Sequence, residues 1–413
     1  MKKKMKLVSI VMVVAMLTTM SLAGCSKAGG GNEATIEWWT PNWNEDASRE
    51  MADEFMAEHP EIKVELVITD WETYRSRITT AISGDNAPEL FTVLLTDIKP
   101  LADLGLLASL NELGKDAGIE YSDFIVPALD ITTVRGDIYG IPFRYDGSGI
   151  FYNVDILEAA GYNSFPETWD DMIVMAEALQ AAGMTAFAWP LGNQAEAVTR
   201  FIQQLYTFGG EILNEDESEA MLNTEAAKRA LANIVDSIES GYASPNSLEL
   251  NNTNMRNMFG SGQLAFNFTG PFDIDVLAEE YPDLNFSTAV IPGNNGMGVT
   301  TANGWCVGMA ENSVNKEAAA LFLAYITNPD NQVRLTDSFP ASKTAIEFEQ
   351  YTTEKLKPFA EQLANSVAEP TYTRWAEIEP IMFQHIQAAV SGSVTVDEAI
   401  ENMNNDLNIL LAS

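Results

Sequence analysis

Two hydrophobic periodicities alternate near the start of the chain, and this order limits the possible folds more than any other sequence feature. In residues 62–68, apolar side chains recur at mostly two-residue intervals, which predicts a strand. Before it, Ala47, Met51 and Phe55 recur at four-residue intervals, which is typical of an amphipathic helix. Strands that alternate with helices usually form a layered structure in which helices cover a sheet. The pattern therefore predicts an α/β fold with a mainly parallel sheet.

The same reasoning can be extended along the whole chain. It predicts strands at residues 36–39, 62–68, 89–95, 138–143, 149–153 and 264–268. It predicts helices at residues 44–58, 71–82, 169–182, 224–240, 315–326 and 396–411. Thr168, followed by Asp171 three residues later, resembles a capping box. A chain of 413 residues exceeds the size at which single cores stop growing, about 250–300 residues, so we expect two domains.

The first 34 residues are set apart by their composition. Lysines precede an apolar run, residues 7–17, which is too short for a membrane span of roughly 20 residues. This order predicts an export signal over residues 1–24. The run Leu22-Ala23-Gly24-Cys25 resembles a bacterial lipobox, which implies that the thiol of Cys25 is lipidated. The alternative is a plain secretory signal with an incidental cysteine. Residues 25–34 are glycine-rich and predict a flexible tether.

Charge and reactive residues exclude several function classes. The chain carries 23 basic and 59 acidic residues, a net charge of -36, and removal of the four signal lysines brings it to about -40. Such a surface repels phosphate backbones, so we expect no nucleic-acid partner. Only Cys25 and Cys306 are cysteines, and a lipidated Cys25 leaves no disulfide. His59 and His385, the only histidines, fit no metal-ligand spacing, so we expect no metal and no cofactor.

Five stretches in the remaining sequence resemble the extracellular solute-binding proteins of ABC importers, in the carbohydrate-binding family that includes maltose-binding protein. They are residues 84–90, 139–143 with 150–157, 260–266 with 269–272, 316–329 and 395–400. Each stretch alone is weak evidence, but their order and spacing across nearly the whole mature chain make the resemblance specific. Such proteins in Gram-positive bacteria are usually lipid-anchored, which agrees with the lipobox.

The resemblance implies the two-lobed α/β fold of periplasmic binding proteins, class II-like, with a hinge and discontinuous lobes. By comparison with the family, the chain crosses between lobes near residues 143, 291 and 340. Lobe 1 would combine residues 35–143 and 292–340, and lobe 2 would combine residues 144–291 and 341–413. Periodicity alone would not predict this arrangement.

Sugars present paired hydroxyls and flat C–H faces, which suit planar polar groups and aromatic rings. Residues of these types cluster in the segments that the family brings to the cleft. Asp146, for example, falls where the family commonly places a ligand carboxylate. The expected ligand-binding residues are Trp39, Asn42, Trp43, Asn44, Asp70, Asp97, Arg144, Asp146, Trp189, Phe272, Asn303, Trp305 and Trp375.

Several of these residues also admit a structural interpretation. One of Trp38 and Trp39 belongs to the core and the other to the cleft, because neighbouring strand residues face opposite sides. Asp70 can equally cap the helix that follows it. Trp189, Trp305 and Trp375 can instead be packing residues.

The sequence therefore predicts a monomeric, non-catalytic receptor on the outer face of the cell membrane of a Gram-positive bacterium. It would capture a sugar, with aromatic richness favouring an oligosaccharide, and deliver it to the membrane permease of an ABC importer. Two alternatives stay open at this point. A secreted glycan hydrolase needs only two carboxyls about 5–9 Å apart. A ligand-sensing partner of a membrane kinase could use the same fold.

Overall fold

The computed structural model describes residues 34–84, 87–363 and 365–413. The expected signal peptide, the lipidation site Cys25 and all but the last residue of the tether lie outside the described residues. Within them, no helix is both long enough and apolar enough to cross a membrane.

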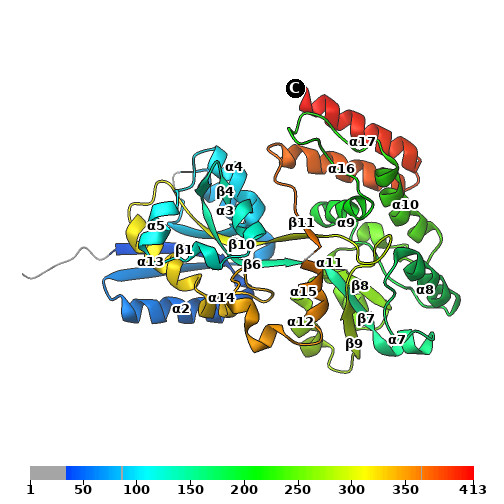
Figure 1. The fold of residues 1–413 in the computed structure, drawn as a ribbon, viewed down its shortest axis with the longest axis horizontal. Helices are drawn as coiled ribbons and strands as arrows, with labels where there is room; N and C mark the ends of the chain where they lie inside the picture. The colour runs from blue at the N-terminus through cyan, green and yellow to red at the C-terminus, as the bar shows by residue number, and fades with distance from the viewer. Residues whose placement is uncertain (1–33, 85–86, 364) are drawn as a thin grey trace, which may run out of the picture.

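Two main sheets organise the molecule (Figure 1). The larger, six-stranded sheet has the order β11-β10-β3-β1-β2, with β6 also paired to β10. Its strands are β1 (Ala34–Pro41), β2 (Ile62–Thr69), β3 (Leu90–Leu94), β6 (Gly140–Gly147), β10 (Thr300–Met309) and β11 (Ser366–Ala368). The smaller sheet contains β7 (Gly149–Asn153), β8 (Phe266–Thr269) and β9 (Phe286–Ala289). A short hairpin joins β4 (Thr133–Val134) to β5 (Asp137–Ile138).

Strand direction differs between the two sheets. In the large sheet, β1 runs parallel to β2 and β3, as the alternation of strands and helices predicts. However, β10 runs antiparallel to β3 and β6, and β7 runs antiparallel to both of its neighbours. The expectation of a mainly parallel sheet is therefore wrong for the smaller sheet. Segments that are distant in the chain can pair as antiparallel strands, and local periodicity does not reveal which segments pair or in which direction.

Helices surround each sheet and give the molecule two bodies (Figure 1). Around the larger sheet lie α2 (Glu45–Glu58), α3 (Trp71–Ile82), α4 (Ile98–Asp103), α5 (Asn111–Asp116), α6 (Val126–Ile131), α13 (Lys316–Ile326) and α14 (Pro329–Leu335). The other body contains α7 (Val154–Ala159), α8 (Trp169–Ala181), α9 (Gln194–Thr207), α10 (Glu225–Glu239), α11 (Asn252–Gly260), α12 (Asp273–Glu280), α15 (Lys357–Leu363), α16 (Trp375–Val390) and α17 (Val396–Leu411).

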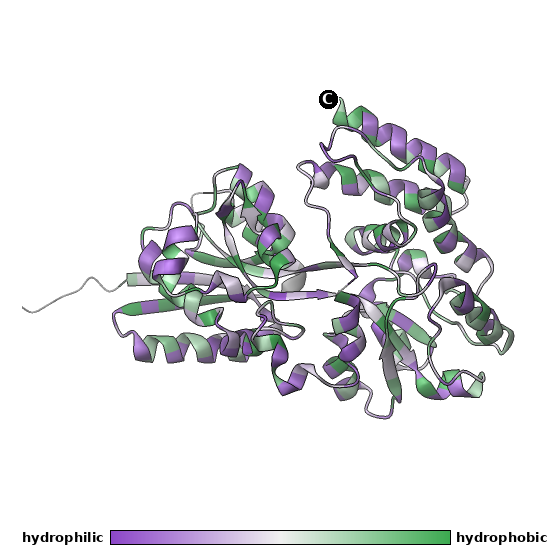
Figure 2. Ribbon diagram, in the orientation of Figure 1, coloured by the Kyte–Doolittle hydropathy of each residue, from purple (hydrophilic) through white to green (hydrophobic). Residues whose placement is uncertain are grey.

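Each body has its own apolar core. One core draws on residues 36–145 and 302–341, and the other on residues 150–291 and 378–407. Figure 2 shows hydrophobic residues concentrated along the strands, while the helices alternate between hydrophobic and hydrophilic residues. A third, smaller apolar cluster joins Phe339 to Phe151 and Phe359 of the second body. Because burial of apolar area drives folding, the two larger cores make each body a folding unit of its own.

Two strands run from one body toward the other in close contact. β6 ends at Gly147, and Ser148 leads directly into β7; β10 pairs with β6 from Ala302 to Gly308. A Cβ at Gly304 would lie 1.9 Å from the backbone oxygen of Arg144, so only glycine permits this approach. The backbone N–H of Ser148 also donates to Thr300 Oγ1 at 2.9 Å. The two crossing strands are thus tied together where they leave the large sheet.

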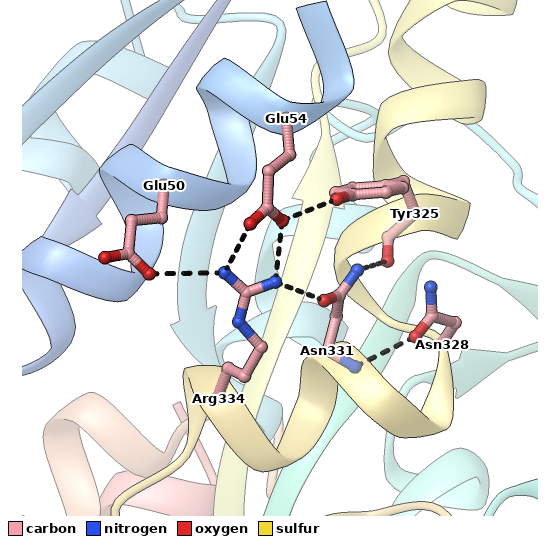
Figure 3. A network of polar contacts seen from close by, with 6 residues as sticks. All are labelled: Glu50, Glu54, Tyr325, Asn328, Asn331 and Arg334. Carbon is pink, nitrogen blue, oxygen red and sulfur yellow. Dashed lines mark hydrogen bonds and ion pairs between the residues drawn. The ribbon is translucent and has the colours of Figure 1, made fainter. Parts of the chain in front are cut away.

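A polar network on the first body fixes α2 against α14 (Figure 3). Arg334 on α14 donates to both carboxylate oxygens of Glu54 on α2, at 2.8 and 3.2 Å. The hydroxyl of Tyr325 donates to Glu54 at 3.0 Å, and Asn331 Oδ1 accepts from Arg334 at 3.0 Å. Every partner in this network belongs to the same body.

The secondary structure agrees with most sequence predictions. The twelve predicted strands and helices all correspond to observed elements, and Thr168 Oγ1 caps α8 by accepting from the backbone N–H of Asp171 at 3.2 Å. Sequence periodicity missed β10, whose central residues include Asn303 and Gly304, and it missed α9.

Candidate ligand-binding cleft

A cavity of about 280 Å³ lies between the two bodies. One wall comes from α3, β6, β10 and the end of β3, and the other from α9, α11, the loop after β8 and residues 369–379. Six of the thirteen expected ligand residues line it. These are Arg144, Asp146, Phe272, Asn303, Trp305 and Trp375.

Arg144 occupies the end of β6 where this strand crosses between the bodies. Its Nε donates to Asp146 Oδ2 at 2.6 Å, and its Nη1 donates to Asp337 Oδ1. The guanidinium also lies over the ring of Phe272, 5.1 Å from the ring centre. Because Arg144 is 8% exposed and doubly paired, it fixes the orientation of Asp146 at the cavity wall.

Glu369, which sequence reasoning missed, adds a half-buried carboxylate to the cavity wall. Glu369 Oε2 accepts a hydrogen bond from Asn303 Nδ2 at 2.6 Å. Burial raises the pKa of Glu369 above its ordinary value, and the hydrogen bond from Asn303 opposes this shift. The Asn303 amide is thereby committed to Glu369, so Asn303 positions this carboxylate in the cavity.

Arg75 also lines the cavity, from α3. Its Nη2 donates to Asp97 Oδ1 at 2.8 Å. Asp97 itself does not line the cavity. Asp97 therefore orients the guanidinium of Arg75, and Arg75 rather than Asp97 reaches the cavity.

Aromatic rings stand on both walls. Trp305 and Trp375 are half-buried and line the cavity from opposite bodies, together with Phe272. Trp43 packs edge-on behind Trp305, with ring centroids 4.6 Å apart. This support restricts the Trp305 ring, and restricted rings provide flat apolar surfaces at low entropic cost.

A second set of missed residues comes from α9. Glu196 lines the cavity and accepts a hydrogen bond from the backbone N–H of Asn252 at 2.8 Å; burial raises its pKa. Arg200, one turn later, is 4% exposed, and burial lowers its pKa to about 10. The guanidinium donates to neutral partners: Ser148, Gln203 and the backbone oxygen of Phe268.

Other expected residues lie outside this cavity. Asn42, Trp43 and Asn44 border a separate hollow on the first body, and Asn44 donates to the backbone oxygen of Leu335. Trp38 is fully buried in the core. Trp39 lies under the guanidinium of Arg77, 5.1 Å from the ring centre, and borders another hollow.

Asp70 is exposed and lies directly before α3. Its backbone oxygen accepts from the N–H groups of Thr73 and Tyr74 at 3.2 and 2.9 Å. This position agrees with the helix-start interpretation, and Asp70 does not line the cavity between the bodies.

The expectation for Trp189 requires a correction. Its side chain is 1% exposed and stacks on Phe268 in the core of the second body, with ring centroids 5.4 Å apart. Its Nε1–H donates to Ser237 Oγ at 2.8 Å, so the polar end of the indole is satisfied internally. Trp189 is a packing residue, because neither its face nor its N–H is available to a ligand.

The missed residues left different traces in the sequence. Glu196 and Arg200 lie four residues apart on α9, beside apolar Ala197 and Phe201, so a helical projection would have placed them on a largely buried face. Glu369 precedes a proline in an irregular segment and left no periodic signal.

The arrangement suits a ligand with many hydroxyl groups. Carboxylates and guanidinium groups can each bond two neighbouring hydroxyls, and the two tryptophan rings can cover apolar ring faces. Among the described residues, no group of three or more His, Cys, Asp or Glu side chains is placed to hold a metal ion.

The model of the family "Bacterial extracellular solute-binding protein" matches residues 41–333, more than half of the chain. This match covers most of both walls of the cavity. The chain belongs to the bacterial extracellular solute-binding protein family. An expectation drawn from the five sequence stretches is thereby confirmed.

Curated relatives extend over the same chain. A putative binding protein of Brucella abortus is 25% identical over 397 residues, which cover 94% of this chain and 95% of the relative. The lactose-binding protein of Rhizobium radiobacter is 30% identical over 247 residues, which cover 57% of this chain and 56% of that protein.

Solved structures share the fold. The GacH receptor of Streptomyces glaucescens GLA.O, determined unliganded and with acarbose, matches with a TM-score of 0.81 at 23% identity. The match covers 92% of this chain and 99% of the receptor chain. At this identity the likeness establishes the fold, and it confirms the two-lobed α/β architecture that the sequence predicts.

Proposed function

We propose that this solute-binding protein captures a sugar, with an oligosaccharide favoured, in the cleft between its two bodies and delivers it to the permease of an ABC importer. The observation that carries the proposal is the composition of the cavity. Trp305 and Trp375 face it from opposite bodies, beside the fixed polar groups of Asp146 and Glu369. The names of the relatives, which bind lactose or acarbose, support the same ligand class.

Isothermal titration calorimetry on the purified protein tests this proposal. The panel comprises maltotriose, lactose and N,N′-diacetylchitobiose, with a dipeptide and a divalent cation as controls. We expect heat of binding for at least one sugar and none for the controls. Binding of the dipeptide or the cation without binding of any sugar would contradict the sugar assignment.

We further infer that binding is not accompanied by hydrolysis. Each lining carboxylate already accepts a hydrogen bond: Asp146 from Arg144, Glu196 from Asn252, Glu369 from Asn303 and Glu379 from Gln194. Groups fixed in this way are suited to holding hydroxyls. Incubation with each sugar, followed by a reducing-sugar assay, is expected to detect no cleavage, and release of shorter products would contradict this inference.

We infer that the moving units are the lobes expected from the family, residues 35–143 with 292–340 and residues 144–291 with 341–413. The two separate cores support this division. Two segments are exceptions within it. Ser342 and Thr344 donate hydrogen bonds to Asp123 of the first body, and residues 366–368 form β11, which pairs with β10 of the large sheet. A ligand that contacts both lobes favours the closed arrangement by its additional contacts there.

We propose that the protein acts as a monomer tethered to the outer face of the cell membrane through lipidated Cys25. The lipobox-like sequence before Cys25 supports this location, as does membership of an extracellular family. Expression of the full chain with radiolabelled palmitate should label the wild type and leave Cys25→Ser unlabelled. Equal labelling of both would contradict the anchor.

A further inference from the structure

A buried polar cluster connects the cavity with both crossing strands. Arg200 lines the cavity, and its Nη1 donates to Ser148 Oγ at 2.9 Å. Ser148 is the single residue between β6 and β7, so it lies on the first crossing. Arg200 therefore contacts the point at which the chain passes from the large sheet to the small one.

The second crossing is reached through Gln203. Its Oε1 accepts from Arg200 Nη1 at 2.9 Å, and its Nε2 donates to Thr301 Oγ1 at 3.1 Å. Thr301 belongs to the start of β10. One guanidinium thus holds both crossing strands, Ser148 directly and Thr301 through the side-chain amide of Gln203.

The hydrogen-bonding capacity of Arg200 is not used up by these contacts. A guanidinium has five N–H groups, and here Nη1 donates twice and Nη2 donates to the backbone oxygen of Phe268 at 2.8 Å. Nε is buried and has no partner among the described residues. Nη2 carries a second N–H that no hydrogen bond in the described part of the chain uses, so the guanidinium retains a donor for an acceptor in the cavity that Arg200 lines.

The charge balance around Arg200 restricts that acceptor. Arg75 and Arg144 form ion pairs with carboxylates, whereas no ion pair of Arg200 is found within the described part of the chain. Glu196 and Glu369 nevertheless lie close enough to act on Arg200 through space. These carboxylates would repel an anion, so a neutral oxygen, such as a sugar hydroxyl, fits the position better than a carboxylate or phosphate.

We propose that Arg200 is both a ligand contact and the positioning residue that couples cleft occupancy to the hinge. The proposal rests on the proposed function, since the acceptor is taken to be a hydroxyl of a bound sugar. A sugar hydroxyl that accepts a hydrogen bond from Arg200 restricts the same guanidinium that holds Ser148 and, through Gln203, the start of β10. A bound sugar therefore favours the arrangement of the crossing strands in which Arg200 can make all these contacts at once.

The test measures the distance between the two bodies. Spin labels are placed by Asp116→Cys on α5 and Glu239→Cys on α10, both exposed, in the full chain carrying Cys25→Ser; Cys306 is buried and does not react. Pulsed electron paramagnetic resonance then gives the distance distribution without sugar. We expect Arg200→Gln and Gln203→Met to shift or broaden it, and Arg200→Lys to restore it only in part, because an ammonium lacks the planar fork.

The matched control is Arg334→Gln, which removes an arginine network of similar size within the first body (Figure 3). It should lower stability without moving the distance distribution. If Arg200→Gln gives the same distribution as the wild type and as Arg334→Gln, Arg200 is merely structural and the coupling is refuted. This arm contains no sugar, so it decides the hinge claim even if the sugar assignment fails.

A second arm adds maltotriose, lactose and N,N′-diacetylchitobiose together. The wild type should shift toward the shorter distance, and Arg200→Gln should require at least tenfold more of the mixture for the same shift. An unchanged requirement would remove Arg200 from the ligand contacts. A wild type that does not respond to the mixture would contradict the sugar assignment and leave the first arm intact.

Discussion

Two arginine networks in this molecule are built on opposite plans. Arg334 joins α2 and α14 of one body and finds its partners in the carboxylates of Glu54 and Glu50 and in Asn331 (Figure 3). Arg200, at the cavity, has neutral partners and a buried Nε that no described residue satisfies. The first network is complete without a ligand, and the second is not.

The carboxylates of the two regions differ in the same way. The hydrogen bond from Arg334 lowers the pKa of Glu54, whereas burial raises the pKa of Glu369 and of Glu196. The surface network thus stabilises ionised groups, while the cleft keeps polar groups partly desolvated. Partly desolvated groups gain the most free energy when a ligand supplies a hydrogen bond. The direction of the pKa shift therefore distinguishes the binding site from the structural network around Arg334.

The largest expected effect is on the aromatic walls. Trp305→Ala should weaken sugar binding by roughly 30- to 150-fold, because hot-spot aromatics contribute about 2–3 kcal/mol. The measurement is calorimetry with the sugar that binds the wild type. Trp189→Phe is the control, since it alters a core indole; it should lower the melting temperature and leave the affinity within about twofold. Equal losses of affinity in Trp305→Ala and Trp189→Phe would contradict the assignment of Trp305 to the cavity wall and Trp189 to the core.

A smaller effect is expected at the fixed carboxylate. Asp146→Ala should weaken the same binding by at least tenfold, because it removes a charge-assisted hydrogen bond to the sugar worth about 1.5 kcal/mol or more, while Arg144 keeps Asp337. An unchanged dissociation constant would remove Asp146 from the site. The melting temperature, measured in parallel, reports any general loss of structure.

Glu369 in the cleft and Glu54 beside Arg334 should change the free energy of unfolding in opposite directions as pH changes. In the unfolded chain Glu369 ionises near 4.5, and in the folded protein its pKa is higher. As pH rises above 4.5, the unfolded chain therefore loses its proton first, and the free energy of unfolding falls until the folded pKa is passed. Urea unfolding at a series of pH values should show this fall reduced in Glu369→Gln.

Glu54 provides the opposite case. Its folded pKa is lowered, so its contribution is present above pH 4.5 and is lost as pH falls through the folded pKa. The difference in stability between the wild type and Glu54→Gln should accordingly shrink on acidification. If stability depends on pH in the same way in the wild type, in Glu369→Gln and in Glu54→Gln, the cleft and the Arg334 network do not differ in their electrostatics.

The smallest effect on binding is expected from the scaffold network. Arg334→Gln should leave the dissociation constant for the sugar within about twofold, because its partners are exposed groups of one body and exposed ion pairs contribute little. Calorimetry and thermal unfolding on the same preparation measure both properties. A loss of affinity as large as that of Asp146→Ala would show that the two networks are coupled.

The sequence predicted elements better than it predicted contacts. Residues 62–68 and 71–82 were assignable because their apolar faces repeat at regular intervals, and both elements formed as expected. Trp189 was misassigned because a tryptophan before a proline looks the same in a core and in a cleft. Asp97 was found, but not its partner Arg75, since an ion pair between residues 22 positions apart depends on how α3 packs beside β3.

The cleft is harder to predict than either lobe for a physical reason. It is formed by the ends of elements that are distant in sequence, such as Asn303 on β10 and Glu369 after β11. No periodicity connects such residues, and only the family resemblance brought Arg144, Asp146 and Trp305 into one site. Residues outside its motifs, including Arg200 and Glu369, became visible only through the folded structure.

The most direct test of the account is a crystal structure of the protein grown with the sugar that gives the strongest calorimetric signal. We expect one sugar ring between Trp305 and Trp375, with its hydroxyls bonded to Asp146, Glu369 and Arg200. A sugar bound elsewhere on the molecule, with this cleft occupied only by water, would contradict it.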